Sequence, residues 1–259
     1  MCKKYVSIAC MKKNCYDKEN GEGSMTMIDC ISVENMRLSD AYTIANMVPS
    51  LELMYRAARG VYQAVNWKGS IAIVVGSGNN GGDGYALAWI LREQGYDCAV
   101  FTVSNRLSND GAYYAEKAVS VGVPVREFTS GCLKEFDIVV DCLLGTGFSG
   151  SVRENYRIAI EEINATDAYI VSVDINSGMN GDTGEVEIAV VSDLTVTIGY
   201  VKTGLVAENA GRYMKRLVCV DIGIVLVKEE RKICGEGETL IPGCLACPSW
   251  LDLNVLKIC

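Results

Sequence analysis

Three apolar runs in this chain stop at glycine-rich turns that carry an aspartate, and this pattern constrains the fold more than any other. The turns are residues 76–84 (GSGNNGGDG) after the run 71–75, residues 141–150 (DCLLGTGFSG) after 138–140, and residues 174–178 (DINSG) after 169–173. In an open parallel sheet such turns lie at the carboxyl ends of strands, where ligands bind. Their backbone N–H groups, aspartates and asparagines together predict one site for a phosphate-bearing ligand, alone or with a cation.

From residue 71 onward, short apolar runs alternate with helical segments, which predicts an α/β fold with a mainly parallel sheet. We expect strands at 71–75, 98–103, 137–141, 169–174, 193–198 and 217–222, a short strand near 123–126, and helices at 82–95, 109–121 and 154–165. Two leading helices are expected at 33–47 and 51–67. One domain should span residues 31–225, with a weakly structured leader at 1–30 and an appendage at 226–259.

The composition excludes several classes of function. A net charge of −8 argues against general nucleic-acid binding, because a phosphate backbone demands a basic face. The chain has no apolar stretch long enough for a membrane span, a poor secretory signal and twelve dispersed cysteines, which together predict a cytoplasmic protein with reduced thiols. It has no histidine, so histidine-based triads and metal sites are excluded, and proton transfer must use Asp, Glu, Lys, Tyr, Cys or water.

The first turn matches the dinucleotide-binding pattern G-x-G-x-x-G at Gly76, Gly78 and Gly81, between a strand and a helix. Its glycines would let the backbone approach a pyrophosphate, which the helix amino terminus attracts. The turn departs from a dehydrogenase because residues 103–106 (VSNR) replace the acidic residue expected about 20 positions further on. Asp83 lies inside the turn instead, and two roles stay equally open: a cap of the following helix, or a ligand contact.

The other two turns add oxygen donors and ionisable groups. Asn80, Asp141 and Ser177, with backbone carbonyls, suit a hard cation, either a monovalent ion or magnesium. An aspartate at a strand end can serve as acid and base in turn, which makes Asp174 the catalytic candidate; the alternative is a side chain that stabilises its own turn. Lys202 follows another strand and either places positive charge at the same edge or is a solvated surface lysine.

Several of these motifs occur together in the order of a known family. Residues 79–84 (NNGGDG), Asp141 with 145–147 (GTG), residues 152–154 (VRE) and residues 173–178 (VDINSG) together resemble the NAD(P)H-hydrate epimerase family, also called the YjeF N-terminal domain. The resemblance extends over about residues 33–224 and includes 36–37 (MR), 49–54 (PSLELM) and 220–224 (VDIGI). Asn176 is a departure, because the family usually has proline there, and the substitution could loosen this loop.

That resemblance implies a Rossmann-like three-layer α/β/α fold, a homodimer, and an isomerase that repairs hydrated NADH or NADPH. It would interconvert the R and S epimers so that a separate NAD(P)H-hydrate dehydratase can use the S form. The resemblance also implies a potassium ion with Asn80, Asp141 and Ser177 as ligands. Lys202 matches a lysine that the family usually has after this strand, which makes it a catalytic candidate in addition to Asp174. The implied nucleotide contacts are Asn79, Asn80, Gly81, Gly82, Asp83, Gly145, Thr146, Gly147, Phe148, Ser149, Gly150, Ser151 and Asp174.

In that substrate, a hydroxyl sits on C6 of a reduced nicotinamide ring, next to N1. We hypothesise that protonated Asp174 helps the hydroxyl leave while the N1 lone pair forms an iminium, and that water returns to either face with Asp174 as base. Two other functions are open: a non-catalytic binding or scaffold module, and a dehydrogenase or methyltransferase on the same fold. The full set of polar residues favours catalysis over a scaffold, and the missing acidic residue after the second strand counts against the last alternative.

Overall fold

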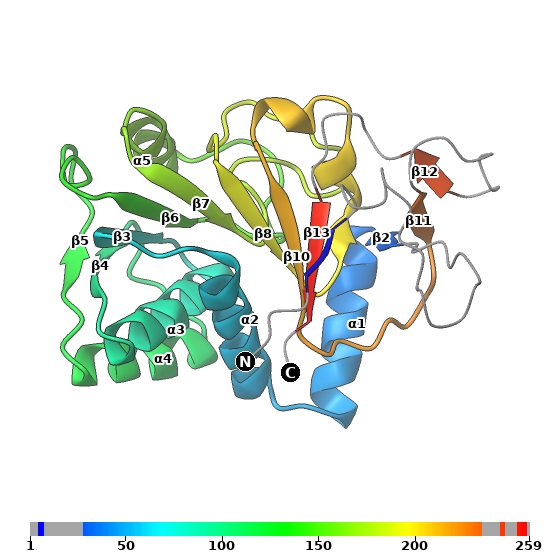
Figure 1. Ribbon diagram of the computed structural model, residues 1–259, viewed down its shortest axis with the longest axis horizontal. Helices are drawn as coiled ribbons and strands as arrows, with labels where there is room; N and C mark the ends of the chain where they lie inside the picture. Colours follow the sequence, from blue (N-terminus) through cyan, green and yellow to red (C-terminus); the bar gives the residue numbers. More distant parts are fainter. Residues whose placement is uncertain (1–4, 8–27, 235–243, 247–252, 258–259) are drawn as a thin grey trace.

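The apolar runs of the sequence form the centre of a nine-stranded sheet (Figure 1). The structure is a computed structural model that describes residues 5–7, 28–234, 244–246 and 253–257. The strand order is β1-β13-β10-β8-β7-β6-β3-β4-β5, and only β1 (Tyr5–Ser7) runs antiparallel to its neighbour. The parallel strands are β3 (Ser70–Val75), β4 (Asp97–Thr102), β5 (Val125–Glu127), β6 (Ile138–Cys142), β7 (Tyr169–Val173), β8 (Leu194–Ile198), β10 (Leu217–Asp221) and β13 (Leu253–Lys257).

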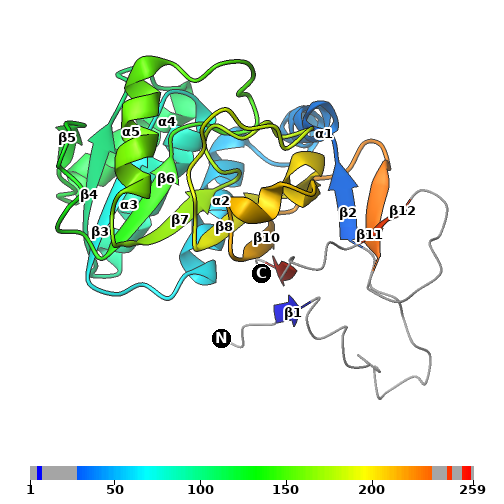
Figure 2. The same ribbon diagram turned by 90° about the horizontal axis from the view of Figure 1, so that it is seen from above.

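Helices cover both faces of this sheet (Figures 1 and 2). One face holds α2 (Ser50–Ala64), α3 (Asn79–Glu93) and α4 (Asn109–Ser120), and the other holds α5 (Glu154–Asn164). On β3, Ile71, Ile73 and Val75 pack in the core of α2, α3 and α4, whereas Ala72 and Val74 pack with α5. Because both faces of β3 are buried, its sequence is continuously apolar rather than alternating. The expected three-layer fold with a mainly parallel sheet is confirmed.

The chain changes direction across the sheet at β3. It adds β4 and β5 on one side of β3 and then returns to place β6 on the other side. Val75 at the end of β3 pairs with Cys142 at the end of β6, so the loops that follow the two strands begin at the same level. At such a switch point the two loops diverge and leave a crevice outside the carboxyl ends of the strands, where ligands bind.

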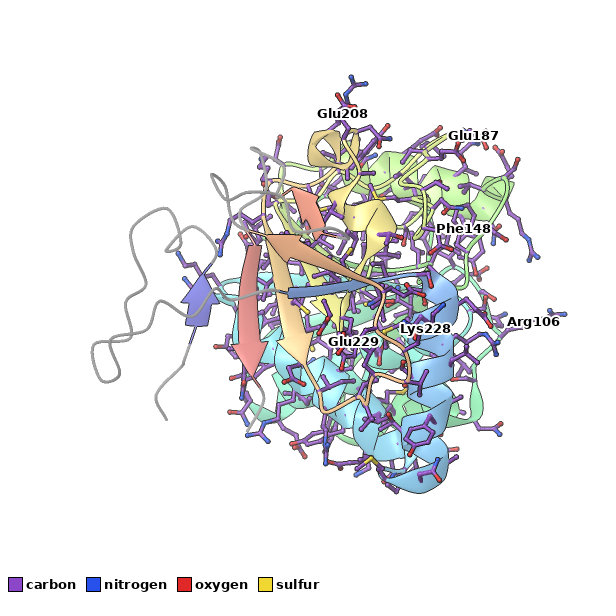
Figure 3. All side chains as sticks on the ribbon, turned by 90° about the vertical axis from the view of Figure 1, so that its right-hand side faces the viewer. Arg106, Phe148, Glu187, Glu208, Lys228 and Glu229 are labelled. Atoms are coloured by element: carbon purple, nitrogen blue, oxygen red, sulfur yellow. The ribbon has the colours of Figure 1, made fainter. Side chains whose placement is uncertain are left out.

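A smaller sheet of order β12-β11-β2-β9 leads into the first helix, α1 (Val33–Asn46). Its strands are β2 (Ile28–Ile31), β9 (Val201–Lys202), β11 (Arg231–Cys234) and β12 (Cys244–Ala246). Polar side chains fasten α1 to residues 225–228, and Lys228 lies against the helix in the side view (Figure 3). Thr43 Oγ1 and Ser39 Oγ accept backbone N–H groups at 2.9 and 3.1 Å, and Asn35 Nδ2 donates to a carbonyl at 2.6 Å.

Two segments differ in detail from the sequence-based expectations. Helix α3 begins at Asn79 rather than at residue 82, because Gly78 with φ 89° ends the loop immediately before it. The described part of 226–259 adds β11 and β12 to the smaller sheet and β13 to the main sheet, parallel to β10. Residues 8–27 of the expected leader lie outside the described residues, so the division into leader, domain and appendage stays a prediction.

Thr43→Val tests how α1 is held. The substitution keeps the shape of the side chain but leaves the Val225 N–H without its acceptor, so we expect the free energy of unfolding to fall by about 1–3 kcal/mol in urea denaturation. Tyr42→Phe removes a hydroxyl from the exposed face of the same helix and should change the free energy of unfolding by less than about 0.5 kcal/mol. Equal effects of the two substitutions would contradict this role of Thr43.

Candidate active site

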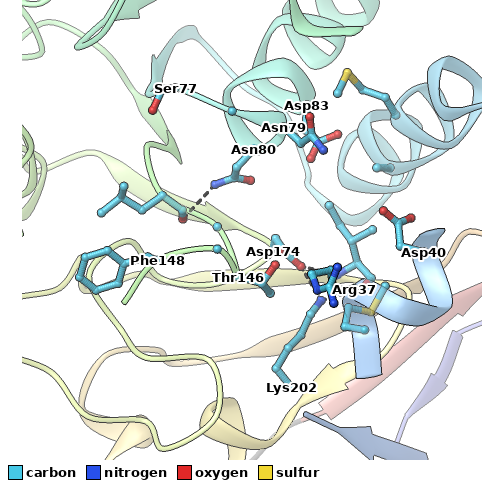
Figure 4. Close-up of a pocket in the computed structure, with 18 of the residues that line it drawn as sticks. Arg37, Asp40, Ser77, Asn79, Asn80, Asp83, Thr146, Phe148, Asp174 and Lys202 are labelled. Atoms are coloured by element: carbon cyan, nitrogen blue, oxygen red, sulfur yellow. Dashed lines mark hydrogen bonds and ion pairs between the residues drawn. The ribbon is translucent and has the colours of Figure 1, made fainter. Parts of the chain in front are cut away.

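The loops after β3 and β6 border a cavity of about 610 Å³ at the switch point (Figure 4). Helices α1, α2 and α3 line one side of it, and the carboxyl ends of the strands line the other. This volume is typical of sites for small molecules and cofactors. All three predicted turns contribute to the lining, through Asn80, Gly145 and Asp174 among others, so residues far apart in the sequence meet at one site.

The first turn brings the amino terminus of α3 to this cavity. Asn79, Asn80 and Asp83 line it, whereas Gly81 and Gly82 do not. A Cβ atom on Gly81 would lie 2.3 Å from the carbonyl oxygen of residue 76, and one on Gly82 would lie 2.6 Å from the end of a methionine side chain on α2. Glycine is required at Gly81, where the close neighbour is backbone, whereas at Gly82 the flexible methionine side chain would have to move. The contact of these two glycines with a ligand stays a prediction.

The second turn lies directly against the first. Residues 145–149 and 151 line the cavity, and Gly150 does not. A Cβ atom on Gly145 would approach Cβ of Asn80 to 3.1 Å, so glycine at this position lets the two loops come together. The Asn80 side chain then joins them, because its Nδ2 donates to the carbonyl oxygen of Leu144 at 3.0 Å.

The third turn holds Asp174 in an ion pair with Lys202 (Figure 4). Asp174 adopts a left-handed backbone with φ 68°, the only non-glycine residue to do so within the described chain. Lys202 Nζ donates to Asp174 Oδ1 at 2.5 Å, to Thr197 Oγ1 at 3.1 Å and to the Ile198 carbonyl at 2.7 Å. Its side chain is 1% exposed, so Lys202 is not a solvated surface lysine. The two predicted catalytic residues are in direct contact.

The loop around Asn176, where the family usually has proline, is held by hydrogen bonds of the asparagine side chain. The buried Asn176 amide donates to the Val190 carbonyl at 3.0 Å, the Ser192 hydroxyl at 3.1 Å and the Tyr213 carbonyl at 2.8 Å, and it accepts from Thr195 Oγ1 at 2.7 Å. A buried polar network of this kind, with its groups satisfied, makes the local structure more rigid.

Beneath the cavity, the three predicted cation ligands form an oxygen-rich cluster. The carboxylate of Asp141 is fully buried and accepts the Ser177 hydroxyl at 2.5 Å, the Ser177 N–H at 3.0 Å and the Ser172 hydroxyl at 2.9 Å. Ser177 Oγ and Asn80 Nδ2 both reach the Leu144 carbonyl, at 3.2 and 3.0 Å. Burial raises the pKa of Asp141, and the hydrogen bonds from Ser177 oppose that shift.

Two features of this cluster fit a cation. Oδ1 of Asn80 is buried and has no hydrogen-bond partner among the described residues, which leaves an oxygen free to act as a ligand. Within the same part of the chain, no lysine or arginine forms an ion pair with the buried Asp141 carboxylate. An amide oxygen, a carboxylate and a hydroxyl are hard ligands of the kind that alkali and alkaline-earth cations take.

Two further acidic groups share the cavity with Asp174. Asp83 lies in α3, whose N-cap is Gly78, and its carboxyl accepts no hydrogen bond within the described chain, so the helix-cap alternative does not hold. Burial raises the pKa of Asp83 well above its usual range, and the charges of Asp174 and Asp40 add to the shift. Burial, followed by the charge of Asp174, also raises the pKa of Asp40, and Lys202 opposes both shifts.

Sequence reasoning did not identify Asp40 as a site residue. It lies on α1 with Met36, Arg37 and Ile44, and all four line the cavity (Figure 4). Their spacing of three and four residues places them on one side of a helix. Residues 36–37 belong to the motifs quoted above, and Asp40 follows one helical turn later on the same side of the expected helix. This periodicity was the signal in the sequence that could have identified Asp40 as a site residue.

Known proteins match the part of this chain that contains the three glycine-rich turns. The family described as "YjeF-related protein N-terminus" matches residues 50–204. The NAD(P)H-hydrate epimerase of Limosilactobacillus fermentum is 37% identical over 202 residues, which cover 74% of this chain and 95% of that protein. The chain belongs to the YjeF-related family.

Other relatives of this YjeF-related domain are longer or more distant. The bifunctional NAD(P)H-hydrate repair enzyme Nnr of Archaeoglobus fulgidus is 35% identical over 216 residues, which cover 82% of this chain but 45% of that protein. The crystal structure of yeast ynu0 has a TM-score of 0.61 at 24% identity, over 68% of this chain and 83% of that one, which supports the fold. Among the described residues, no helix combines the length and the apolar character that a membrane span needs.

Lys202→Met tests the ion pair of this YjeF-related domain. The substitution leaves the Asp174 carboxylate, 14% exposed, without its charged partner, so we expect the free energy of unfolding to fall by about 3 kcal/mol in urea denaturation. Adding Asp174→Asn should recover part of that loss, because the unpaired charge is then gone. Strictly additive losses in the double variant would contradict a direct coupling between the two side chains.

Proposed function

We propose that this chain is an NAD(P)H-hydrate epimerase, an isomerase that interconverts the R and S forms of hydrated NADH and NADPH. Relatives of that name match about three quarters of the chain at 35–37% identity. The observation that carries the proposal is the Lys202–Asp174 ion pair, which places a charged carboxylate in a cavity beside two glycine-rich loops. A reaction that develops positive charge on a nucleotide ring needs this combination.

The glycine-rich loops suit the pyrophosphate of the substrate. The amino terminus of α3 opens onto the cavity at Asn79, and the first N–H groups of a helix, with its positive end, attract phosphate. Arg153 lines the same cavity and can pair with a phosphate oxygen. With the pyrophosphate bound there, the nicotinamide ring is proposed to lie next to Asp174 and Lys202.

The chemistry then follows from the charges of that pair. The C6 hydroxyl leaves with its bonding electrons while the N1 lone pair forms an iminium, and water adds back to C6. The Asp174 carboxylate stabilises the cationic ring and accepts a proton from the incoming water. In the ion pair Lys202 already carries a proton and Asp174 is ionised, whereas the sequence-based hypothesis starts from protonated Asp174. A further group must therefore give the leaving oxygen its proton.

A potassium ion held by Asn80, Asp141 and Ser177 is part of this proposal. Two observations on the described residues support it: Oδ1 of Asn80 has no hydrogen-bond partner, and the buried carboxylate of Asp141 has no ion pair with a lysine or arginine. When bound, the ion supplies positive charge that offsets Asp141 and holds the loops after β3, β6 and β7 together. The proton transfers stay with the side chains of the cavity.

The alternative of a non-catalytic scaffold is less well supported. A scaffold has no need for an ionisable carboxyl such as Asp83, which is partly buried and has no hydrogen-bond donor within the described chain. We further propose that an NAD(P)H-hydrate dehydratase consumes the S form, since the relative Nnr is described as a bifunctional repair enzyme. A homodimer and a cytoplasmic location stay predictions.

Purified R-hydrate of NADPH is the direct test of activity. The wild-type protein should convert it to the S form faster than the spontaneous reaction, as followed by chromatography. Asp174→Asn should lower kcat by roughly 100-fold or more while leaving NADPH binding intact. Asparagine accepts the left-handed backbone at φ 68°, but it leaves the buried Lys202 ammonium without its charged partner, so urea denaturation should confirm that the variant is folded under the assay conditions. A wild-type rate equal to the spontaneous background would favour the scaffold.

Thermal unfolding tests the potassium ion separately from catalysis. Potassium chloride should raise the Tm of the wild type by about 2 °C or more over tetramethylammonium chloride at equal concentration, because a ligand of the native state stabilises it. Asn80→Ala removes the unpartnered oxygen and should abolish that difference. Asn155→Ala, which removes an exposed amide on α5, is the matched control and should keep it. A potassium effect that survives in Asn80→Ala would rule out this site.

A further inference from the structure

Three carboxyl groups share the cavity with one buried ammonium. Asp40 comes from α1, Asp83 from α3 and Asp174 from the turn after β7, and they line the same space (Figure 4). The ammonium of Lys202 is bonded to Asp174 and not to the other two. Within the described residues, no three acidic or cysteine side chains are placed to hold a metal ion together. A shared cation therefore does not explain the trio.

Asp83 is the member of the trio whose negative charge would be least stabilised by its surroundings. Asp174, Asp40 and Lys202 are the charges that act on Asp83. The other ionisable groups of this region are Arg37, Asp110, Arg153 and Tyr156 in the cavity lining and Cys142 at the end of β6. Neither arginine is paired with it: Arg37 bonds to Glu34, and Arg153 is exposed. Burial and the two neighbouring carboxylates raise the pKa of Asp83 well above its ordinary value of 3.8, so its neutral, proton-carrying form is favoured.

An acid–base pair consists of two carboxyl groups in opposite protonation states, and here the two groups lie on different walls of the cavity. Asp83 belongs to the α3 wall of the cavity, and Asp174 belongs to the wall formed by the strand ends. A ring bound between the walls offers one face to each group. A single carboxyl on one wall reaches one face, whereas epimerisation requires loss of water from one face and addition to the other.

We propose that Asp83 is a second catalytic residue, which exchanges a proton with the C6 oxygen on one face of the ring while Asp174 does so on the opposite face. This inference rests on the proposed epimerase function. Asp83 transfers its proton to the C6 hydroxyl, the C6–O bond breaks, and water departs as the N1 lone pair forms the N1=C6 bond. The cationic ring then lies between two carboxylates.

The second half of the reaction reverses these steps on the other face. A lone pair of a water molecule forms the new C6–O bond from the Asp174 side, the π electrons of N1=C6 return to N1, and Asp174 takes one proton of that water. Asp174 releases this proton to solvent and Asp83 regains one, which restores the starting state. For the opposite epimer the same steps run in reverse: Asp174, in the protonated state that ends the forward reaction, gives its proton to the C6 oxygen, and Asp83 takes one from the water that adds on its face. No other reactant is consumed.

Asp83→Asn tests the inference, with Asp97→Asn at the exposed start of β4 as the control for loss of one carboxylate. Asp83→Asn should lower kcat for R-hydrate conversion by roughly 100-fold or more, whereas its affinity for NADPH should stay within about 3-fold of the wild type. The wild-type rate should fall at alkaline pH as Asp83 loses its proton, and this fall should be absent from the residual rate of the variant. Asp83→Glu, which restores a carboxyl, should recover part of both the rate and the alkaline fall.

Folding stability gives a second readout that does not depend on activity. Because folding raises the pKa of Asp83, its contribution to stability is greatest below the ordinary value of 3.8 and is lost as pH rises through the folded-state pKa. Urea denaturation of the wild type should show this loss relative to Asp83→Asn, and Asp97→Asn should follow the wild type. A pH-independent difference between wild type and Asp83→Asn would overturn the protonated state that the inference requires.

The outcomes separate this inference from the proposed function. If the wild type fails to convert the R-hydrate above background, the epimerase proposal fails. If the wild type converts it and Asp83→Asn keeps the wild-type kcat and alkaline fall, only the role of Asp83 fails. A variant that loses NADPH affinity at unchanged kcat would also overturn it, since Asp83 would then bind the substrate without taking part in proton transfer.

Discussion

A single buried lysine holds the parts of this site in place. Lys202 belongs to β9 of the smaller sheet, yet its ammonium is bonded to the end of β8 and to Asp174 beyond the end of β7, both in the main sheet. A buried ammonium without partners would cost several kcal/mol, so the two sheets must meet where these acceptors converge. The same contact leaves a charged carboxylate at the cavity, so one interaction serves both the fold and the chemistry.

Three aspartates within one region show how environment decides what a side chain can do. Asp174 forms an ion pair with an ammonium group. Asp141 is buried and accepts hydrogen bonds from hydroxyl and backbone N–H groups, and Asp83 has neither kind of partner among the described residues. An ion pair favours the charged form, and burial without a donor favours the neutral form. The three residues are therefore suited to different work: charge stabilisation, cation binding and proton donation.

Much of the fold could be predicted because it depends on local pattern. Runs such as 71–75 are apolar on both faces, so they could only be central strands between two layers of helices. The turns after β3, β6 and β7 were recognisable from their glycines, and parallel strands bring such turns to one edge. The contribution of β13 to the main sheet was not predictable, because residues 226–259 show no helical or strand periodicity in their apolar residues. Their pairing with β10 is a contact between segments that are not neighbours in the sequence.

The site was predicted in outline but not in its charges. Asp40 was missed because the contacts that hold α1 at the cavity come from distant segments, among them hydrogen bonds to residues 225–228, nearly two hundred positions away in the chain. Lys202 looked equally suited to solvent, since nothing near it in the sequence reveals the three acceptors that bury it. The sequence did not show what would hold the loop at Asn176, because three of its four partners lie at residues 190–195 and the fourth is Tyr213.

The sequence by itself determined the strands, the glycine-rich turns and the types of side chain they carry, because these depend on residues that are neighbours along the chain. Only the tertiary structure decided which aspartate is paired, which is hydrogen-bonded and which is left to hold a proton. Those states depend on burial and on charges from distant segments, and a carboxyl group acquires them only when the chain has folded around it.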